Sequence, residues 1–341
     1  MIRTSRPTRL LSVLFLCVGA DPAWASSPPA PQQLLESALS PDVPFKGRMM
    51  VTHWFGKQTQ AEEVQVYHAL PNLTRREFLS PDGAVQRVMV SDGDTEEILL
   101  LKNRKVVSGD AVKSYEKVMK PERELEMLFS NYELSVSTNT DEVAGRKAWV
   151  LELKPKVSGK PWQRLWIDQQ AGIILENKRF LPKHHYAVLS RYSHIEISKS
   201  LDPKLFELTL SSAGAGPGLE PDFMTLEELR KATGKPVSFP QELPAGFAFE
   251  SADRFNYKDH EVLHARYTDG LDVLSLFQTD RPVSLPKGGT AALAPPAKGL
   301  GSSIRLSTAG RVLNWKHGKQ YFTLISDVSV ELLQSISAKL K

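Results

Sequence analysis

The chain has 341 residues, 24% of them charged, and a formal net charge of only +4 at neutral pH. This balance lacks the basic surplus with which nucleic-acid-binding proteins neutralise phosphates, so we expect no nucleic-acid partner. Single hydrophobic cores stop growing at roughly 250–300 residues, so the length favours two domains over one.

The N-terminal residues have the order of a secretory signal peptide. Arg3, Arg6 and Arg9 precede an apolar run over residues 10–20, and Ala23-Trp24-Ala25 supplies small residues for cleavage. The run is shorter than the roughly 20 apolar residues that a membrane-spanning helix needs. We therefore expect residues 1–25 to be removed and the rest to be a soluble periplasmic protein.

Cys17 is the only cysteine of the chain, and it lies inside this expected signal peptide. Leu16 before it is not the small residue that lipoprotein signals carry, so lipid attachment is the less favoured alternative. An exported chain without a thiol has no disulfide, no thiolate metal site and no cysteine nucleophile. Without residues 1–25 the net charge also falls to about +2.

A stretch rich in Ser, Ala, Gly and Pro divides the exported chain. It covers residues 211–221 and has no apolar periodicity, which is typical of an interdomain linker. The expected domains are therefore residues 31–210 and 222–341.

The larger domain is expected to begin with a short helix and to continue with strands. Leu34, Leu35 and Ala38 have helical spacing within residues 31–39. Period-two alternation then predicts strands, with turn signals such as Pro81-Asp82-Gly83 between them. A second helix is predicted at residues 121–129. The predicted strands are 48–54, 63–67, 75–79, 85–90, 97–101, 132–138, 148–153, 163–168 and 173–180.

This order predicts an α+β fold, in which a strongly curved antiparallel sheet forms an incomplete barrel closed by helices. A smaller α+β domain would follow. The concave face of such a sheet can accept an acyl chain with few specific contacts. The alternative is that the same apolar residues only fill a core. The candidate lipid-binding residues are Met49, Val51, Val64, Val66, Leu99, Leu101, Leu151, Leu153, Leu165 and Ile167.

A zinc-protease pattern occurs in the smaller domain, at His260-Glu261-Val262-Leu263-His264. This pattern binds zinc when a helix places both histidines on one face, with the glutamate as general base. On a strand the two histidines would be about 13 Å apart, because each residue rises about 3.3 Å. Asp269-Gly270 soon after would end a helix within a turn, so we expect no metal site. A zinc peptidase, with His317 or Asp272 as third ligand, is the least favoured alternative.

Two segments of the larger domain resemble LolA/LolB-type lipoprotein carriers. One is the strand–turn–strand of residues 164–175, with its Trp166-Ile167-Asp168 signature, and the other is residues 201–206. In the smaller domain, Leu243-Pro244-Ala245-Gly246-Phe247 and Tyr267-Thr268-Asp269-Gly270-Leu271 resemble motifs of the MucB/RseB family. That family joins a LolA-like domain to a smaller C-terminal domain. Thr268 stands where the family more often has serine.

The resemblance implies a regulator of an envelope-stress sigma factor, of the sigma-E type. Such a protein binds the periplasmic part of a membrane-spanning anti-sigma factor and protects it from proteolysis, with relief by lipid, lipopolysaccharide or acylated protein. It implies no enzymatic activity and no cofactor. The alternative is a carrier of lipid or lipoprotein. The candidate partner-binding residues are Tyr267, Asp269, Gly270, Leu271 and Phe277.

In the partner hypothesis Tyr267 and Leu271 would be exposed anchors beside the turn, because aromatic residues concentrate at interface hot spots. The alternative is that Asp269-Gly270 only reverses the chain.

Overall fold

The structure is a computed structural model. It describes residues 27–55, 58–92, 95–100, 105–110, 119–182, 185–208, 223–257, 260–282, 291–294, 303–307 and 310–340. The expected signal peptide and linker lie outside these residues.

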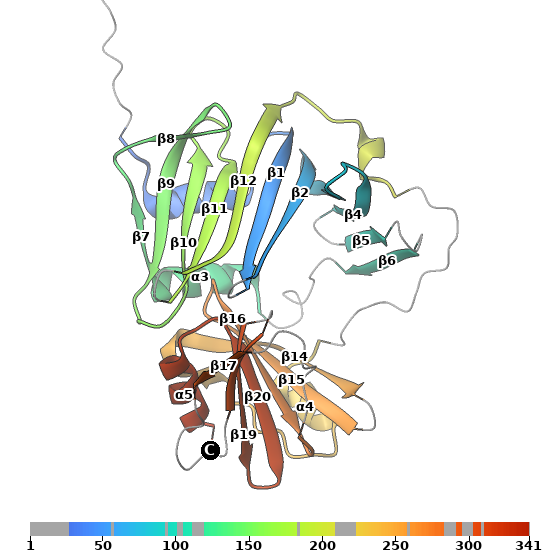
Figure 1. Cartoon of the computed structure of the whole chain (residues 1–341), viewed down its shortest axis with the longest axis vertical. Helices are drawn as coiled ribbons and strands as arrows, with labels where there is room; N and C mark the ends of the chain where they lie inside the picture. The colour runs from blue at the N-terminus through green and yellow to red at the C-terminus, as the bar shows by residue number, and fades with distance from the viewer. Residues whose placement is uncertain are drawn as a thin grey trace, which may run out of the picture.

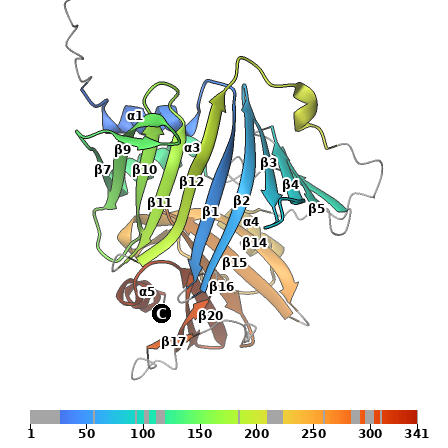
Figure 2. The same cartoon turned by 45° about the horizontal axis from the view of Figure 1, so that its top comes forward.

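The first part of the described chain forms a twelve-stranded antiparallel sheet in the order β6-β5-β4-β3-β2-β1-β12-β11-β10-β9-β7, with β8 also paired to β9. The sheet curls into a half-barrel (Figure 1, Figure 2). Its strands are β1 (Phe45–Phe55), β2 (Gln58–Ala69), β3 (Leu73–Leu79), β4 (Val85–Ser91), β5 (Thr95–Leu100), β6 (Lys105–Asp110), β7 (Tyr132–Val136), β8 (Asp141–Val143), β9 (Arg146–Pro155), β10 (Trp162–Asp168), β11 (Ile174–Leu181) and β12 (His185–Ile197).

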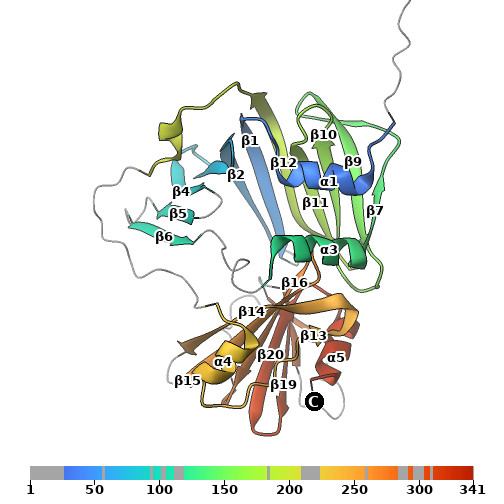
Figure 3. The same ribbon diagram turned by 180° about the vertical axis from the view of Figure 1, so that it is seen from behind.

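Two helices cross the concave face of the half-barrel, α1 (Pro31–Leu39) and α3 (Pro121–Asn131). Of the two, α3 lies nearer to the second, C-terminal part of the chain (Figure 3). Both begin with a proline, whose missing N–H costs nothing in a first turn. Acidic residues in the first turn of α3 also stabilise the start of this helix, because their negative charges lie at the positive end of the helix dipole.

The helices and strands enclose a core beneath α1. Residues three and four apart share one face of a helix, so Leu34, Leu35 and Ala38 turn together toward the sheet. The buried members of this core are Leu34, Leu35, Ala38, Leu128, Tyr132, Trp149, Leu151, Leu153, Leu165 and Ile167.

The second part of the chain forms an eight-stranded antiparallel sheet in the order β13-β14-β15-β16-β20-β19-β18-β17. Helices α4 (Leu226–Ala232) and α5 (Val330–Ala338) contribute buried leucines and an isoleucine to its core. The strands are β13 (Glu242–Leu243), β14 (Phe247–Tyr257), β15 (His260–Thr268), β16 (Val273–Thr279), β17 (Ala291–Ala294), β18 (Ser303–Ser307), β19 (Gly310–His317) and β20 (Gln320–Ser326). Short 3-10 turns occur at η2 (Pro203–Phe206) and η3 (Pro244–Gly246).

The predicted fold class is confirmed: a strongly curved antiparallel sheet is closed by few helices and followed by a smaller mixed part. The helix predicted at 31–39 has those bounds, and the one predicted at 121–129 ends two residues later, at Asn131. Strand β12 was not predicted, although it joins the two halves of the half-barrel by pairing with both β1 and β11. Within the part of the chain that the structure describes, no helix has the length and apolar character needed to cross a bilayer.

Candidate functional site

A groove of about 500 Å³ opens on the concave face, beside the end of α1. Alternate residues of a strand share one face, so β1 presents Met49 and Val51 to it and β2 presents Val64 and Val66. Phe78 of β3 extends this apolar lining. The groove is therefore an apolar trough at the part of the sheet that the helices leave open.

Several polar side chains interrupt the apolar lining, among them Arg76, Asn177 and Tyr192. Arg76 lies on the concave side of β3, exposed, and no ion pair to it occurs among the described residues. The side-chain oxygen of Asn177 is buried without a hydrogen-bond partner. Burial raises the pKa of the Tyr192 phenol, and nearby Arg76 only partly offsets this. The phenol is therefore neutral, and the one formal charge in the lining is the guanidinium of Arg76.

The ten candidate lipid-binding residues separate into three groups. Met49, Val51, Val64 and Val66 line the groove. Leu151, Leu153, Leu165 and Ile167 lie beneath the helices, each at most 4% exposed, so they fill the core. Leu99 belongs to a different cluster, around Phe206 of η2, and Leu101 lies outside the described residues.

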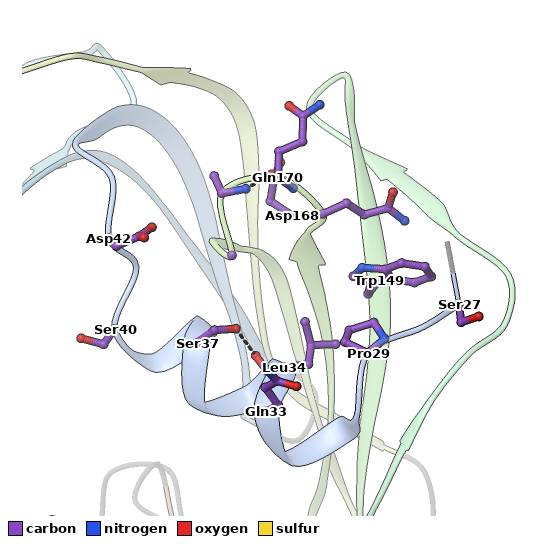
Figure 4. A pocket seen from close by; sticks show the side chains of 13 residues that line it. Ser27, Pro29, Gln33, Leu34, Ser37, Ser40, Asp42, Trp149, Asp168 and Gln170 are labelled. Carbon is purple, nitrogen blue, oxygen red and sulfur yellow. Dashed lines mark hydrogen bonds between the residues drawn. The ribbon is translucent and has the colours of Figure 1, made fainter. Parts of the chain in front are cut away.

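A second hollow, of about 530 Å³, lies between α1 and the turn after β10 (Figure 4). Leu34 and Pro29 point toward Trp149 of β9, and the other lining side chains are mostly amides and hydroxyls. The Ser37 hydroxyl is already used, since it donates to the carbonyl oxygen of Leu34 at 3.0 Å. The groove is therefore the stronger candidate for an apolar ligand.

The aspartate of the Trp166-Ile167-Asp168 signature stabilises the turn after β10. Oδ1 of Asp168 accepts hydrogen bonds from the backbone N–H groups of Gln170 at 2.9 Å and Ala171 at 2.7 Å, and Oδ2 pairs with Arg146. Burial alone would raise the pKa of Asp168, but these donors outweigh it and hold the pKa below the usual value. This aspartate stabilises the hairpin of β10 and β11.

The segment Tyr267 to Leu271 ends β15 and begins the turn to β16, and Gly270 and Leu271 of this turn contact the half-barrel. Tyr267 is 0% exposed, and its hydroxyl donates to the carbonyl oxygen of Pro240 at 2.9 Å. The expectation of an exposed anchor at Tyr267 is therefore wrong: the ring belongs to the core of the smaller part. Leu271 is half-buried against the core beneath α1.

Gly270 lies against α3. Its φ is +96°, and a Cβ there would collide with the backbone nitrogen of Leu128. Phe277, the last partner-binding candidate, is half-buried on β16 and stacks on His264 with ring centroids 4.3 Å apart.

Buried charges join the two parts of the chain at this turn. Nζ of Lys160 lies 2.7 Å from Oδ2 of Asp269, and both side chains are 0% exposed. The hydroxyl of Tyr132 donates to the same carboxylate oxygen at 2.9 Å. Arg179 pairs with both Asp272 and Asp327. Burial raises the pKa of Asp272 to about 6, although Arg179 opposes the shift.

Sequence reasoning did not find Lys160, Tyr132 or Arg179. Nothing in the Gly-Lys-Pro sequence around Lys160 indicates that this lysine is buried. Arg179 resembles the other arginines and lysines of the predicted strands. Only their contacts across the two parts distinguish them.

The zinc-protease pattern lies on strand β15. Nδ1 of His264 is 2.8 Å from Oδ2 of Asp253, and Glu261 accepts a hydrogen bond from Thr233 and pairs with Arg254. The helix that this motif needs is absent at β15, so the zinc hypothesis loses its geometric basis. No group of three metal-ligating side chains occurs among the described residues.

Comparison with known proteins gives a family match for the half-barrel. Residues 44–206 match the family model described as the MucB/RseB N-terminal domain. No curated protein matches the chain.

Two solved structures share the arrangement of almost the whole chain. One is described as MucB in complex with MucA(peri), with a TM-score of 0.58 and 15% identity, covering 90% of this chain and 97% of that one. The other is described as the MucA/MucB complex of Pseudomonas aeruginosa, with a TM-score of 0.57 and 17% identity, covering 90% and 96%. At these identities the likeness establishes the fold.

The family match agrees with the resemblance inferred from the sequence motifs. Residues 44–206 of the chain therefore form a domain that matches the MucB/RseB N-terminal domain.

Proposed function

We propose that the protein acts in the periplasm by binding the periplasmic part of a membrane-spanning anti-sigma factor, which it shields from proteolysis. The observation that carries this proposal is the fold likeness over 90% of the chain to MucB crystallised with MucA(peri). A likeness that spans both sheets favours a regulator over a simple carrier, for which the half-barrel alone would suffice. Residues 31–210 and 222–341 would be its two domains.

Capture from the cell envelope tests the partner. The exported protein is immobilised, and the proteins that it retains from detergent-solubilised membranes are identified by mass spectrometry. We expect a single-pass anti-sigma factor, whose periplasmic part is cut more slowly by protease when the captured complex is intact. Recovery of many acylated lipoproteins and no such factor would overturn the proposal in favour of a carrier.

The partner surface is proposed to include residues that stay accessible near the junction of the two parts. Leu271 and Phe277 are only half-buried, so direct contacts are proposed for these two. Tyr267, Asp269 and Gly270 would act indirectly, by fixing the shape of the turn.

A second proposed activity is binding of an acyl chain in the groove, with loss of the anti-sigma factor as the consequence. The supporting observation is the apolar trough whose lining includes Arg76, a cation that pairs with no carboxylate among the described residues. Such a lining suits an amphiphile that has an anionic head and an apolar tail.

Two neighbouring methionines offer a matched pair of variants for this activity. Met49 lines the groove, whereas Met50 lies on the opposite face of β1 and is 43% exposed. Met49→Trp should fill the trough and weaken binding of dodecyl phosphate at least tenfold, measured by calorimetry, while Met50→Trp should bind like the parent protein. Equal affinities in the two variants would place the acyl site elsewhere.

A further inference from the structure

Helix α3 is held from two sides by different parts of the chain. On its inner side, Leu128 packs into the core beneath α1, together with Leu151 and Ile167 of the half-barrel. On its outer side, η3 and the turn after β15 contact it (Figure 3). The helix thus belongs to the core of the half-barrel and also lies where the two parts meet.

Backbone contacts at this junction leave no room for side chains. Gly270 approaches the α3 backbone where a Cβ would collide with Leu128. The side-chain nitrogen of Asn131, the last residue of α3, donates to the carbonyl oxygens of Asp269 at 2.9 Å and Gly246 at 3.2 Å. The end of α3 is therefore capped by two loops of the smaller part.

A buried ion pair locks the same contact. The Lys160 ammonium lies 2.7 Å from the Asp269 carboxylate, and neither side chain is exposed. The ammonium also lies 5.0 Å from the centroid of the Phe247 ring and 5.5 Å from that of Tyr132. Lys160 and Tyr132 come from the half-barrel, whereas Asp269 and Phe247 come from the smaller part.

Removing one partner of a buried ion pair is costly. The charge that remains has lost its hydration and has no opposite charge beside it. The pair resists separation while it is dry and is replaced by hydrated charges once water enters. Packed interfaces in general switch between discrete arrangements rather than deform continuously.

We propose that α3 and the Lys160–Asp269–Tyr132 cluster form a latch. This latch couples the end of the concave face that α3 covers to the smaller domain. With the latch closed, α3 is seated and the two parts move as one body. When it opens, the smaller part separates and α3 loses its contacts with η3 and with the turn after β15, so the concave face loses its cover at that end. By reciprocity, an event that displaces α3 from within the half-barrel releases the smaller part.

The latch is tested on the exported protein by two measurements that need no ligand. Small-angle X-ray scattering gives the maximum dimension, and hydrogen exchange read by mass spectrometry gives the protection of residues 121–136. The variants are Lys160→Met, which leaves Asp269 unpaired, and Tyr132→Phe, which removes only the hydroxyl. Gly270→Ala wedges the contact, and Gly83→Ala is its control, because Gly83 also has positive φ but nothing within 4 Å of an added Cβ.

We expect Lys160→Met and Gly270→Ala to enlarge the molecule and to speed exchange in α3 at least tenfold, while peptides of β1 and β15 keep their protection. Tyr132→Phe should give a smaller change in the same direction, and Gly83→Ala none. A larger molecule with unchanged protection of α3 would overturn the coupling. Unchanged dimensions in all of these variants would overturn the latch itself.

Discussion

The turn after β10 and the turn after β15 are built around one aspartate each. Oδ1 of Asp168 accepts from the N–H groups two and three residues later, and Oδ1 of Asp269 does the same at 3.0 and 2.8 Å. Each second oxygen pairs with a cation, Arg146 or Lys160. A glycine of positive φ follows in both turns, at Gly172 and Gly270.

The two turns differ in where the cation comes from. Arg146 lies on β9, next to the strand that carries Asp168, and its side chain is 22% exposed. Lys160 belongs to the other part of the chain and is fully buried. The same local chemistry therefore closes a hairpin in one place and joins two domains in the other.

Lys160→Met should be the most damaging change. Loss of the cation leaves Asp269 as a buried, uncompensated charge, which costs about 3–5 kcal/mol. Urea unfolding should then separate into two transitions, one for each part. Arg146→Met should cost less and keep a single transition, because water can reach the partly exposed site of its guanidinium. Equal losses in the two variants would remove the contrast between the turns.

Gly172 and Gly270, one in each turn, extend this comparison of the two turns. An added Cβ at Gly172 meets its nearest neighbour at an ordinary 3.6 Å, so Gly172→Ala should cost only the backbone strain of about 1–2 kcal/mol. Gly270→Ala adds a collision with the backbone of α3 and should cost about 3 kcal/mol, near the upper end of overpacking effects. Thermal unfolding measures both. A similar melting temperature for the two variants would contradict the close approach at Gly270.

The pH dependence should have opposite signs at the two turns. The pKa of Asp168 is lowered, so its contribution to stability is present above the unfolded pKa and lost as the pH falls below it. Asp272 has a pKa raised to about 6 from 3.8, so the folded state holds its proton longer than the unfolded chain. Its contribution is present below the unfolded pKa and is lost as the pH rises from about 4 to about 6.

The groups that face Asp272 are Arg179, Asp269, Asp327 and the Tyr132 hydroxyl, with Lys160 beyond Asp269. Asp272→Asn should flatten the loss of stability between pH 4 and 6, which amounts to at most about 3 kcal/mol. Denaturant unfolding at stepwise pH checks this. An unchanged slope in Asp272→Asn would assign the titration to another group.

Within the Lys160–Asp269–Tyr132 cluster, the smaller expected effect is that of Tyr132→Phe. The ring stays packed while Asp269 loses one hydrogen bond of 2.9 Å to a charged acceptor, so the loss should be about 1.5–2 kcal/mol. Combining it with Asp269→Asn should give less than the sum of the single losses, since the two residues share the bond. Strict additivity in this double-mutant cycle would mean that the bond contributes nothing.

Several elements could be predicted because their signals are local. Residues 31–39 carry a proline start and apolar residues at helical spacing, and residues 163–168 alternate and end in a turn aspartate. Strand β12 was missed because its histidines, arginine and serines give it no continuous apolar face, although it pairs with a neighbour on each side. Its place was decided by hydrogen bonds to distant strands, which a local pattern does not contain.

By itself, the sequence determined both helices of the half-barrel and most of its strands, the family motifs, the turn signal of Asp269-Gly270, and the apolar face of the half-barrel. Only the tertiary structure decided which of those apolar residues are covered by α1 and α3 and which line the groove. It alone also paired Lys160 with Asp269, 109 positions away in the chain. Turn and helix signals depend on neighbours a few residues apart, whereas cover and ion pairing depend on which surfaces meet after folding.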